Sequence, residues 1–121
     1  MGTSLGIDEI VKILGADIIL DKGWLRGKIS TVYGSDLMSD ILAYSKSNSL
    51  LLTNLINPQT IRTAEMVEIA VVCFIHGKHP HKETLELAQQ NEMPLLKTGL
   101  SMFEACGKLY AAGMMDCKDL P

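Results

Sequence analysis

Polar residues that can bind an anion follow three apolar runs of the chain, LLL (50–52), AVVCFI (70–75) and PLL (94–96). Hydroxyl, amide and ammonium groups beside the free N–H groups of a helix N-terminus can hold a phosphate or a carboxylate. The same residue types cap helices, and capping explains each of them separately, so it is the simpler interpretation. The candidate ligand-binding residues are Thr53, Asn54, Asn57, His76, Gly77, Lys78, Thr98, Gly99 and Ser101.

Three histidines, His76, His79 and His81, form the pattern H-x-x-H-x-H, which could bind a transition metal. The nearest residues of other ligand types are Cys73, inside an apolar run, and Glu83, on the outer side of a predicted helix, and the segment contains a proline that is typical of a surface loop. We therefore predict no dedicated metal site and no cofactor.

No catalytic motif is present in the sequence. There is neither a GxxxxGK[ST] nor a GxGxxG pattern, and Gly77-Lys78 lacks the glycine-rich loop before it. Asp36 and Asp40 can be interpreted as a carboxylate pair or as a helix cap and a solvated residue. Of the three cysteines, Cys73 and Cys106 lie in apolar patterns and are expected to be buried, which leaves Cys117 as the plausible reactive thiol.

The composition excludes several functional classes. The chain has 121 residues, of which 47% are apolar and 21% charged, as in one globular domain. A net charge of −3 and an aromatic content of 5% argue against binding of nucleic acid. No run reaches the length of a membrane span, and the N-terminus lacks the pattern of a signal peptide. We expect a cytoplasmic protein that binds neither nucleic acid nor membranes.

Hydrophobic periodicity predicts strands that alternate with helices. The final helix begins after Ser101 and reaches about Gly113. The other expected elements are strands at 17–20, 28–33, 50–53, 70–75 and 94–97, and helices at 7–14, 37–44, 58–68 and 81–90.

Several local features of these elements are expected. Strand 28–33 alternates as an edge or half-exposed strand does, whereas strand 70–75 is uniformly apolar and should be central. Asn57 and Pro58 fit the N-cap and first position of a helix, Ser4 could cap helix 7–14, and Ser35 or Asp36 could cap helix 37–44.

Three helix faces or ends are assigned from the apolar pattern. In helix 37–44 the inward residues are expected to be Leu37, Met38, Ile41 and Leu42. In the last helix the apolar stripe is expected to contain Met102, Phe103, Cys106, Leu109, Tyr110 and Gly113. Residues 114–121 are expected to form a loose tail, although Met114 and Met115 are apolar enough to pack on another part of the chain.

The order β-α-β-α-β-α-β-α from residue 28 onward, with short connections, predicts a single α/β domain (1–121) with a mostly parallel sheet flanked by helices. The carboxyl ends of parallel strands lie at one edge of a sheet, where ligands commonly bind. The candidate residues above are therefore expected to share that edge.

Three blocks of the chain, LLLTNLINPQTIRTAE (50–65), VVCFIHGKHP (71–80) and PLLKTGLSMFEACGKLYAAG (94–113), resemble the DRTGG-domain family. The resemblance extends from the first helix to Gly113, although the Asp-Arg-Thr-Gly-Gly run itself is not legible here. It implies a fold similar to the N-terminal domain of HPr kinase/phosphorylase, without the catalytic P-loop part.

The resemblance also implies a function. Joined to CBS domains in pyrophosphatases, such domains are regulatory and form dimers, which implies a non-enzymatic regulatory or assembly module, homodimeric, with a small ligand or a regulatory protein as partner. Two alternatives remain: a nucleotide- or anion-binding domain at the strand ends, and an unrecognised enzyme.

Overall fold

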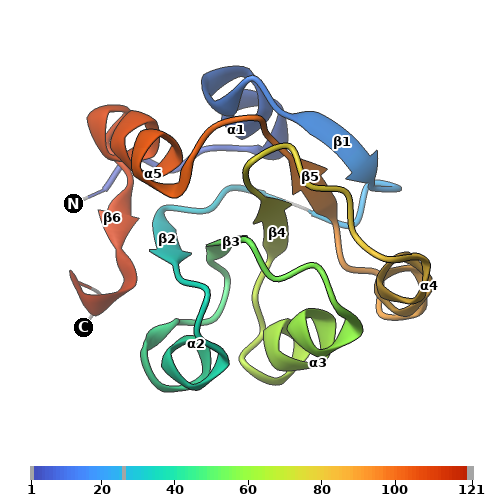
Figure 1. Cartoon of the computed structure of the whole chain (residues 1–121). Coiled ribbons are helices and arrows are strands. Elements are labelled where there is room, and N and C mark those ends of the chain that lie inside the picture. The colour runs from blue at the N-terminus through green and yellow to red at the C-terminus, as the bar shows by residue number, and fades with distance from the viewer. Residues whose placement is uncertain (1, 26, 120–121) are drawn as a thin grey trace.

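The computed structural model describes residues 2–25 and 27–119, and within them the chain forms one six-stranded sheet covered by five α-helices (Figure 1). The strand order is β1-β5-β4-β3-β2-β6. The strands are β1 (Asp17–Leu20), β2 (Thr31–Gly34), β3 (Leu50–Thr53), β4 (Val71–Phe74), β5 (Leu95–Lys97) and β6 (Met115–Asp116). The helices are α1 (Ile7–Leu14), α2 (Met38–Tyr44), α3 (Pro58–Met66), α4 (Lys82–Gln90) and α5 (Met102–Ala111), followed by a 3₁₀ turn, η1 (Cys117–Asp119).

The sheet has a hydrophobic core on each face because its central strands β3 and β4 are almost wholly apolar and are buried at every position. Along β3, Leu50 and Leu52 pack with the α1 and α5 side, whereas Leu51 packs with the opposite side. This alternation follows from the two-residue period of a strand. Helices α1 and α5 cover one face, and α2, α3 and α4 cover the other (Figure 1).

The predicted fold class is confirmed. Strands β2 to β6 pair in parallel, and β1 alone among the described strands pairs antiparallel, with β5. Strand β4 is central and buried on both faces, as its uniformly apolar sequence predicts.

The second predicted strand is shifted along the chain, and one of the two settings predicted for it is confirmed. It spans Thr31–Gly34, not 28–33, and Ile29 instead forms an isolated antiparallel bridge with Leu5. It is half-buried as expected, but it is not at the edge, because β6 pairs with its outer side.

Several helix assignments also need correction. Helix α1 begins after Gly6 rather than Ser4, α2 begins after Leu37, and α3 ends at Met66. Leu37 and Leu42 are exposed, and only Ile41 of α2 is fully buried.

Two aromatic residues of α5 face solvent, contrary to the predicted stripe. Phe103 is 87% exposed and Tyr110 is 78% exposed, whereas Ala105 and Leu109 are buried. The buried arc of the helix is therefore rotated by about one residue from the one that apolar side chains alone suggest.

The predicted loose tail is wrong for residues 114–119, and residues 120–121 lie outside the described part. Met114 is buried, and the N–H of Met115 donates to the carbonyl of Ser30 (2.8 Å) where β6 joins β2. Gly113 makes the sharp reversal after α5 possible, since its φ of +99° suits glycine.

A buried polar cluster fixes the end of this segment. The hydroxyl oxygens of Thr31 and Ser49 lie 2.6 Å apart, and the Cys117 thiol donates to Ser49 (3.3 Å). Cys117 is fully buried, so the sequence-based choice of Cys117 as the reactive thiol is wrong. The cluster satisfies polar groups that would be costly to bury alone.

Met114 tests whether the C-terminal segment is part of the core. We expect Met114→Ala to lower the free energy of unfolding by about 2–5 kcal/mol, since it leaves a cavity at a buried site. Met66→Ala is the matched control, because Met66 is 71% exposed and its truncation should change stability by less than about 0.5 kcal/mol. Urea denaturation measures both, and equal small effects would contradict a packed C-terminus.

Candidate functional site

The loop after β3 is tied down by a carboxylate from the loop after β2. The Asn54 N–H donates to Oδ1 of Asp36 (2.6 Å), and the Thr53 hydroxyl donates to the same oxygen (3.4 Å). The Thr53 hydroxyl also accepts from the Leu55 N–H (3.2 Å). Asp36 therefore occupies the position where a bound anion would meet Thr53 and Asn54. Sequence reasoning placed Asp36 only in a helix cap or in a pair with Asp40.

Asn57 lies at the N-cap of α3 with Pro58 in the first turn, as predicted, but its side chain makes no capping hydrogen bond. Within the described part of the chain, Oδ1 of Asn57 and Oδ1 of Asn54 are buried without a hydrogen-bond partner. Buried acceptors are ordinarily satisfied, and an outside donor could reach these two oxygens only if the loop moved, because they have almost no exposed surface.

The loops after β4 and β5 are bonded directly to each other. The N–H of Gly77 donates to the carbonyl of Thr98, and the N–H of His76 donates to that of Leu100, each at 2.8 Å. Gly77 adopts a φ of +67°, which brings its backbone close to Gly99. The buried hydroxyl of Thr98 donates to the carbonyl of Leu14 (2.7 Å). These backbone N–H groups and the Thr98 hydroxyl are therefore used by hydrogen bonds that stabilise the fold.

Ser101 is a helix cap. Its hydroxyl accepts from the Glu104 N–H, while the Glu104 carboxylate accepts from the Ser101 N–H, each at 3.2 Å. This reciprocal arrangement is a capping box. The capping interpretation thus accounts for Ser101, and the hydrogen bonds of the fold account for Thr53 and Thr98.

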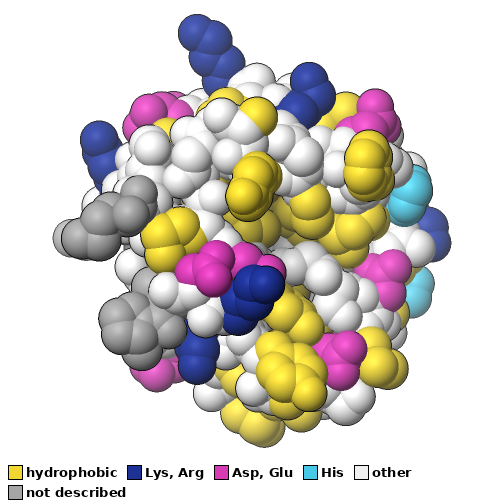
Figure 2. Space-filling model, turned by 90° about the vertical axis from the view of Figure 1, so that its left-hand side faces the viewer, with side chains coloured by type: hydrophobic (Ala, Val, Ile, Leu, Met, Phe, Trp, Pro, Cys, Tyr) yellow, Lys and Arg dark blue, Asp and Glu magenta, His cyan; other side chains and the backbone are white. Residues whose placement is uncertain are grey.

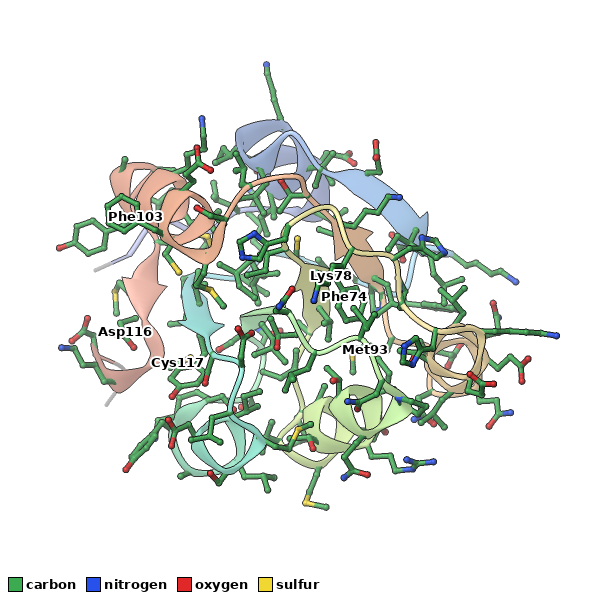
Figure 3. All side chains as sticks on the ribbon, in the orientation of Figure 1. Phe74, Lys78, Met93, Phe103, Asp116 and Cys117 are labelled. Carbon is green, nitrogen blue, oxygen red and sulfur yellow. The ribbon has the colours of Figure 1, made fainter. Side chains whose placement is uncertain are left out.

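The side chains that remain open at this edge of the sheet are few. Lys78 and His76 are exposed in the loop that follows β4, and Figure 3 labels Lys78 near the middle of the view. The strand-end loops therefore offer one ammonium group and two unpartnered amide oxygens rather than a ring of free N–H donors.

His76, His79 and His81 are all exposed. Nowhere in residues 2–25 and 27–119 do three His, Cys, Asp or Glu side chains gather so that they could hold a metal ion.

A pocket of about 190 Å³ lies between α5, β2 and the C-terminal segment, a site that sequence reasoning missed. Strand β2 contributes Val32, Tyr33 and Gly34, and α5 contributes Cys106, Leu109 and Tyr110. Residues 114–116 complete the lining. We call it the α5 pocket. It could not be found from sequence because a third of its lining residues belong to the segment expected to be a loose tail.

Gly34 allows α5 to approach the sheet beside this pocket. A Cβ atom at Gly34 would lie 2.8 Å from Sδ of Met102 and 3.0 Å from Sγ of Cys106, which is too close for a real side chain. A larger residue at this position would have to displace the side chains of Met102 and Cys106 that pack over β2.

The pKa values of the Cys73 and Cys106 thiols are raised, which makes these two thiols less reactive. Burial raises the pKa of Cys73 to about 12. Burial, and then the charge of Asp116, raises the pKa of Cys106. Burial also raises the pKa of Tyr33, with contributions from Asp40 and Asp116. A raised pKa keeps a thiol protonated, and the protonated form is a poor nucleophile.

No helix within the described residues has the length and apolar character needed to cross a membrane.

Neither a protein-family model nor a curated protein matches this chain. A solved structure does: the CBS and DRTGG domains of the regulatory region of Clostridium perfringens pyrophosphatase, complexed with the activator diadenosine tetraphosphate. The TM-score is 0.71 at 16% sequence identity, and the match covers 90% of this chain. The chain spans about half of that structure (47%). At this identity the match establishes the fold alone: the chain has a DRTGG-like α/β fold, as the sequence blocks implied.

Proposed function

We propose that this protein is a non-enzymatic regulatory module that acts as a homodimer and responds to a small ligand. The observation that carries the proposal is the DRTGG-like fold, which it has in common with a regulatory region that binds an activator nucleotide. The raised pKa values of Cys73 and Cys106 keep both thiols protonated and therefore poor nucleophiles, which is consistent with a non-enzymatic role.

The side of the molecule that carries α5, β6 and α2 supports dimer formation. Helices α5 and α2, with the residue before α2, carry five large exposed hydrophobic side chains, and we call the surface formed by these elements the α5–α2 face. Figure 2 shows hydrophobic side chains above and below a strip of charged ones on this side. The five residues are Leu37, Leu42, Tyr44, Phe103 and Tyr110. An isologous dimer across this face would remove them from water and cover the outer edge of β6.

Phe103 provides the test of the dimer. Since it is 87% exposed, Phe103→Ser should leave the monomer folded while it removes a large apolar contact from the proposed interface. We expect the wild type to have the mass of a dimer at micromolar concentration in size-exclusion chromatography with light scattering, and the variant to have that of a monomer.

Met66→Ser is the matched control for this experiment. Met66 is also strongly exposed but lies on α3, outside the α5–α2 face, so this variant should remain dimeric. A wild type that is monomeric at these concentrations, or a Phe103→Ser variant that stays dimeric, would contradict the proposed interface.

A nucleotide site at the strand ends is the second candidate. The unpartnered Oδ1 atoms of Asn54 and Asn57 favour it, because the amino group of a base or a ribose hydroxyl could donate to them. The exposed ammonium of Lys78 could then bind a phosphate. The carboxylate of Asp36 would repel a phosphate placed at Asn54, so the phosphates would have to lie on the Lys78 side.

Lys78→Ala tests this second candidate. We expect adenosine diphosphate to raise the melting temperature of the wild type, and the variant to bind it about tenfold more weakly, as for the loss of one charge-assisted hydrogen bond. Isothermal titration measures the affinities. Lys46→Ala is the control, because the exposed Lys46 precedes β3 and so lies toward the opposite edge of the sheet. Absence of binding to the wild type at millimolar nucleotide would exclude this site.

A further inference from the structure

The size of the α5 pocket limits what it can hold. Its volume is about 190 Å³, whereas an engineered protein cavity of about 150 Å³ accommodates benzene and pockets for drug-sized ligands span about 300–1,000 Å³. A nucleotide is too large for it. A molecule with one ring, or a short branched chain, fits.

The lining determines the charge of that molecule. Asp116 is the single charged side chain among the residues that line the pocket within the described part of the chain. An anionic ligand would be repelled there, whereas a cation would be attracted. The pocket therefore favours a cation, whereas the strand-end loops, where Lys78 lies, favour an anion.

The carboxylate of Asp116 is held in place and still has room for a ligand. One of its oxygens accepts from the backbone N–H of Lys118 (3.1 Å), which uses one of about four lone-pair positions. Its charge acts on groups from both walls, since it contributes to the raised pKa of Cys106 on α5 and of Tyr33 on β2.

The remaining walls suit the apolar part of a small amine. Leu109 and Met114 are buried and provide a hydrophobic floor, while the rings of Tyr33 and Tyr110 provide aromatic surface. Aromatic rings also attract a cation placed over their faces.

We propose that the α5 pocket binds a small organic cation, an amine with one ring or a short apolar chain, whose ammonium group pairs with Asp116 and whose apolar part packs on Leu109 and Met114. This site is separate from the strand-end loops and does not depend on the proposed function.

Cys106 is a built-in reporter for occupancy. It is half-buried in the pocket wall, whereas Cys73 and Cys117 are fully buried. A small thiol-specific reagent such as methyl methanethiosulfonate should thus modify Cys106 first in the native protein, and a bound ligand should slow that reaction. The experiment uses the Phe103→Ser variant, so that a second copy of the chain does not shield Cys106 from the reagent.

Three probes of similar shape separate charge from size: benzylamine, benzyl alcohol and benzoate. At neutral pH we expect benzylamine to protect Cys106 at about fivefold lower concentration than benzyl alcohol, the ratio for one charge pair at an exposed carboxylate. Benzoate should give no protection. Peptide mapping by mass spectrometry measures the rate at each cysteine.

Asp116→Asn should abolish the advantage of benzylamine over benzyl alcohol, since the amide keeps the acceptor oxygen for Lys118 but loses the charge. Asp119→Asn, in the same segment but outside the pocket lining, should leave the advantage unchanged. Three results would overturn the proposal: equal protection by all three probes, an advantage of benzylamine that survives Asp116→Asn, or no protection by benzylamine at 20 mM. That concentration corresponds to about the weakest affinity that one small ring can provide.

Discussion

The structure depends on the return of the C-terminal segment to β2. Without β6, β2 would be an open edge strand, and the hydroxyls of Thr31 and Ser49 would lose the thiol of Cys117 that closes their cluster. Burial of Met114 links the end of α5 to the same core. Because a buried polar group is costly without its partner, the cluster favours this one position of the segment over others.

Two surface features follow from that return. Residues 114–116 form one wall of the α5 pocket and supply its carboxylate, Asp116. The segment also places β6 between α5 and α2 (Figure 1), and both helices carry exposed aromatic side chains, Phe103 and Tyr110 on α5 and Tyr44 on α2. The proposed small-amine site and the proposed dimer face thus both depend on residues 114–116.

Sequence patterns predicted the parts of the fold that are governed by local signals. The apolar runs of β3 and β4 and the Asn57-Pro58 helix start are examples, and the parallel order followed from them. The exposure of Phe103 and Tyr110 could not be predicted, because both are apolar and at helical spacing, and only the position of the sheet decides which arc of α5 is buried. The two residues of β6 carry no strand signal, since their partner in β2 is more than 80 residues away in the sequence. The role of Asp36 could not be predicted for a similar reason, because its partner Asn54 lies in a different loop, the one after β3.

Amide hydrogen exchange at Met115 tests the central claim most directly. Its N–H donates to the carbonyl of Ser30 in the β2–β6 pair (2.8 Å). If the C-terminal segment completes the sheet, this amide exchanges slowly, with protection comparable to that of the neighbouring amides in β2. Exchange at the rate of an unstructured peptide would show a loose tail, and it would contradict both the completed sheet and the pocket beneath α5.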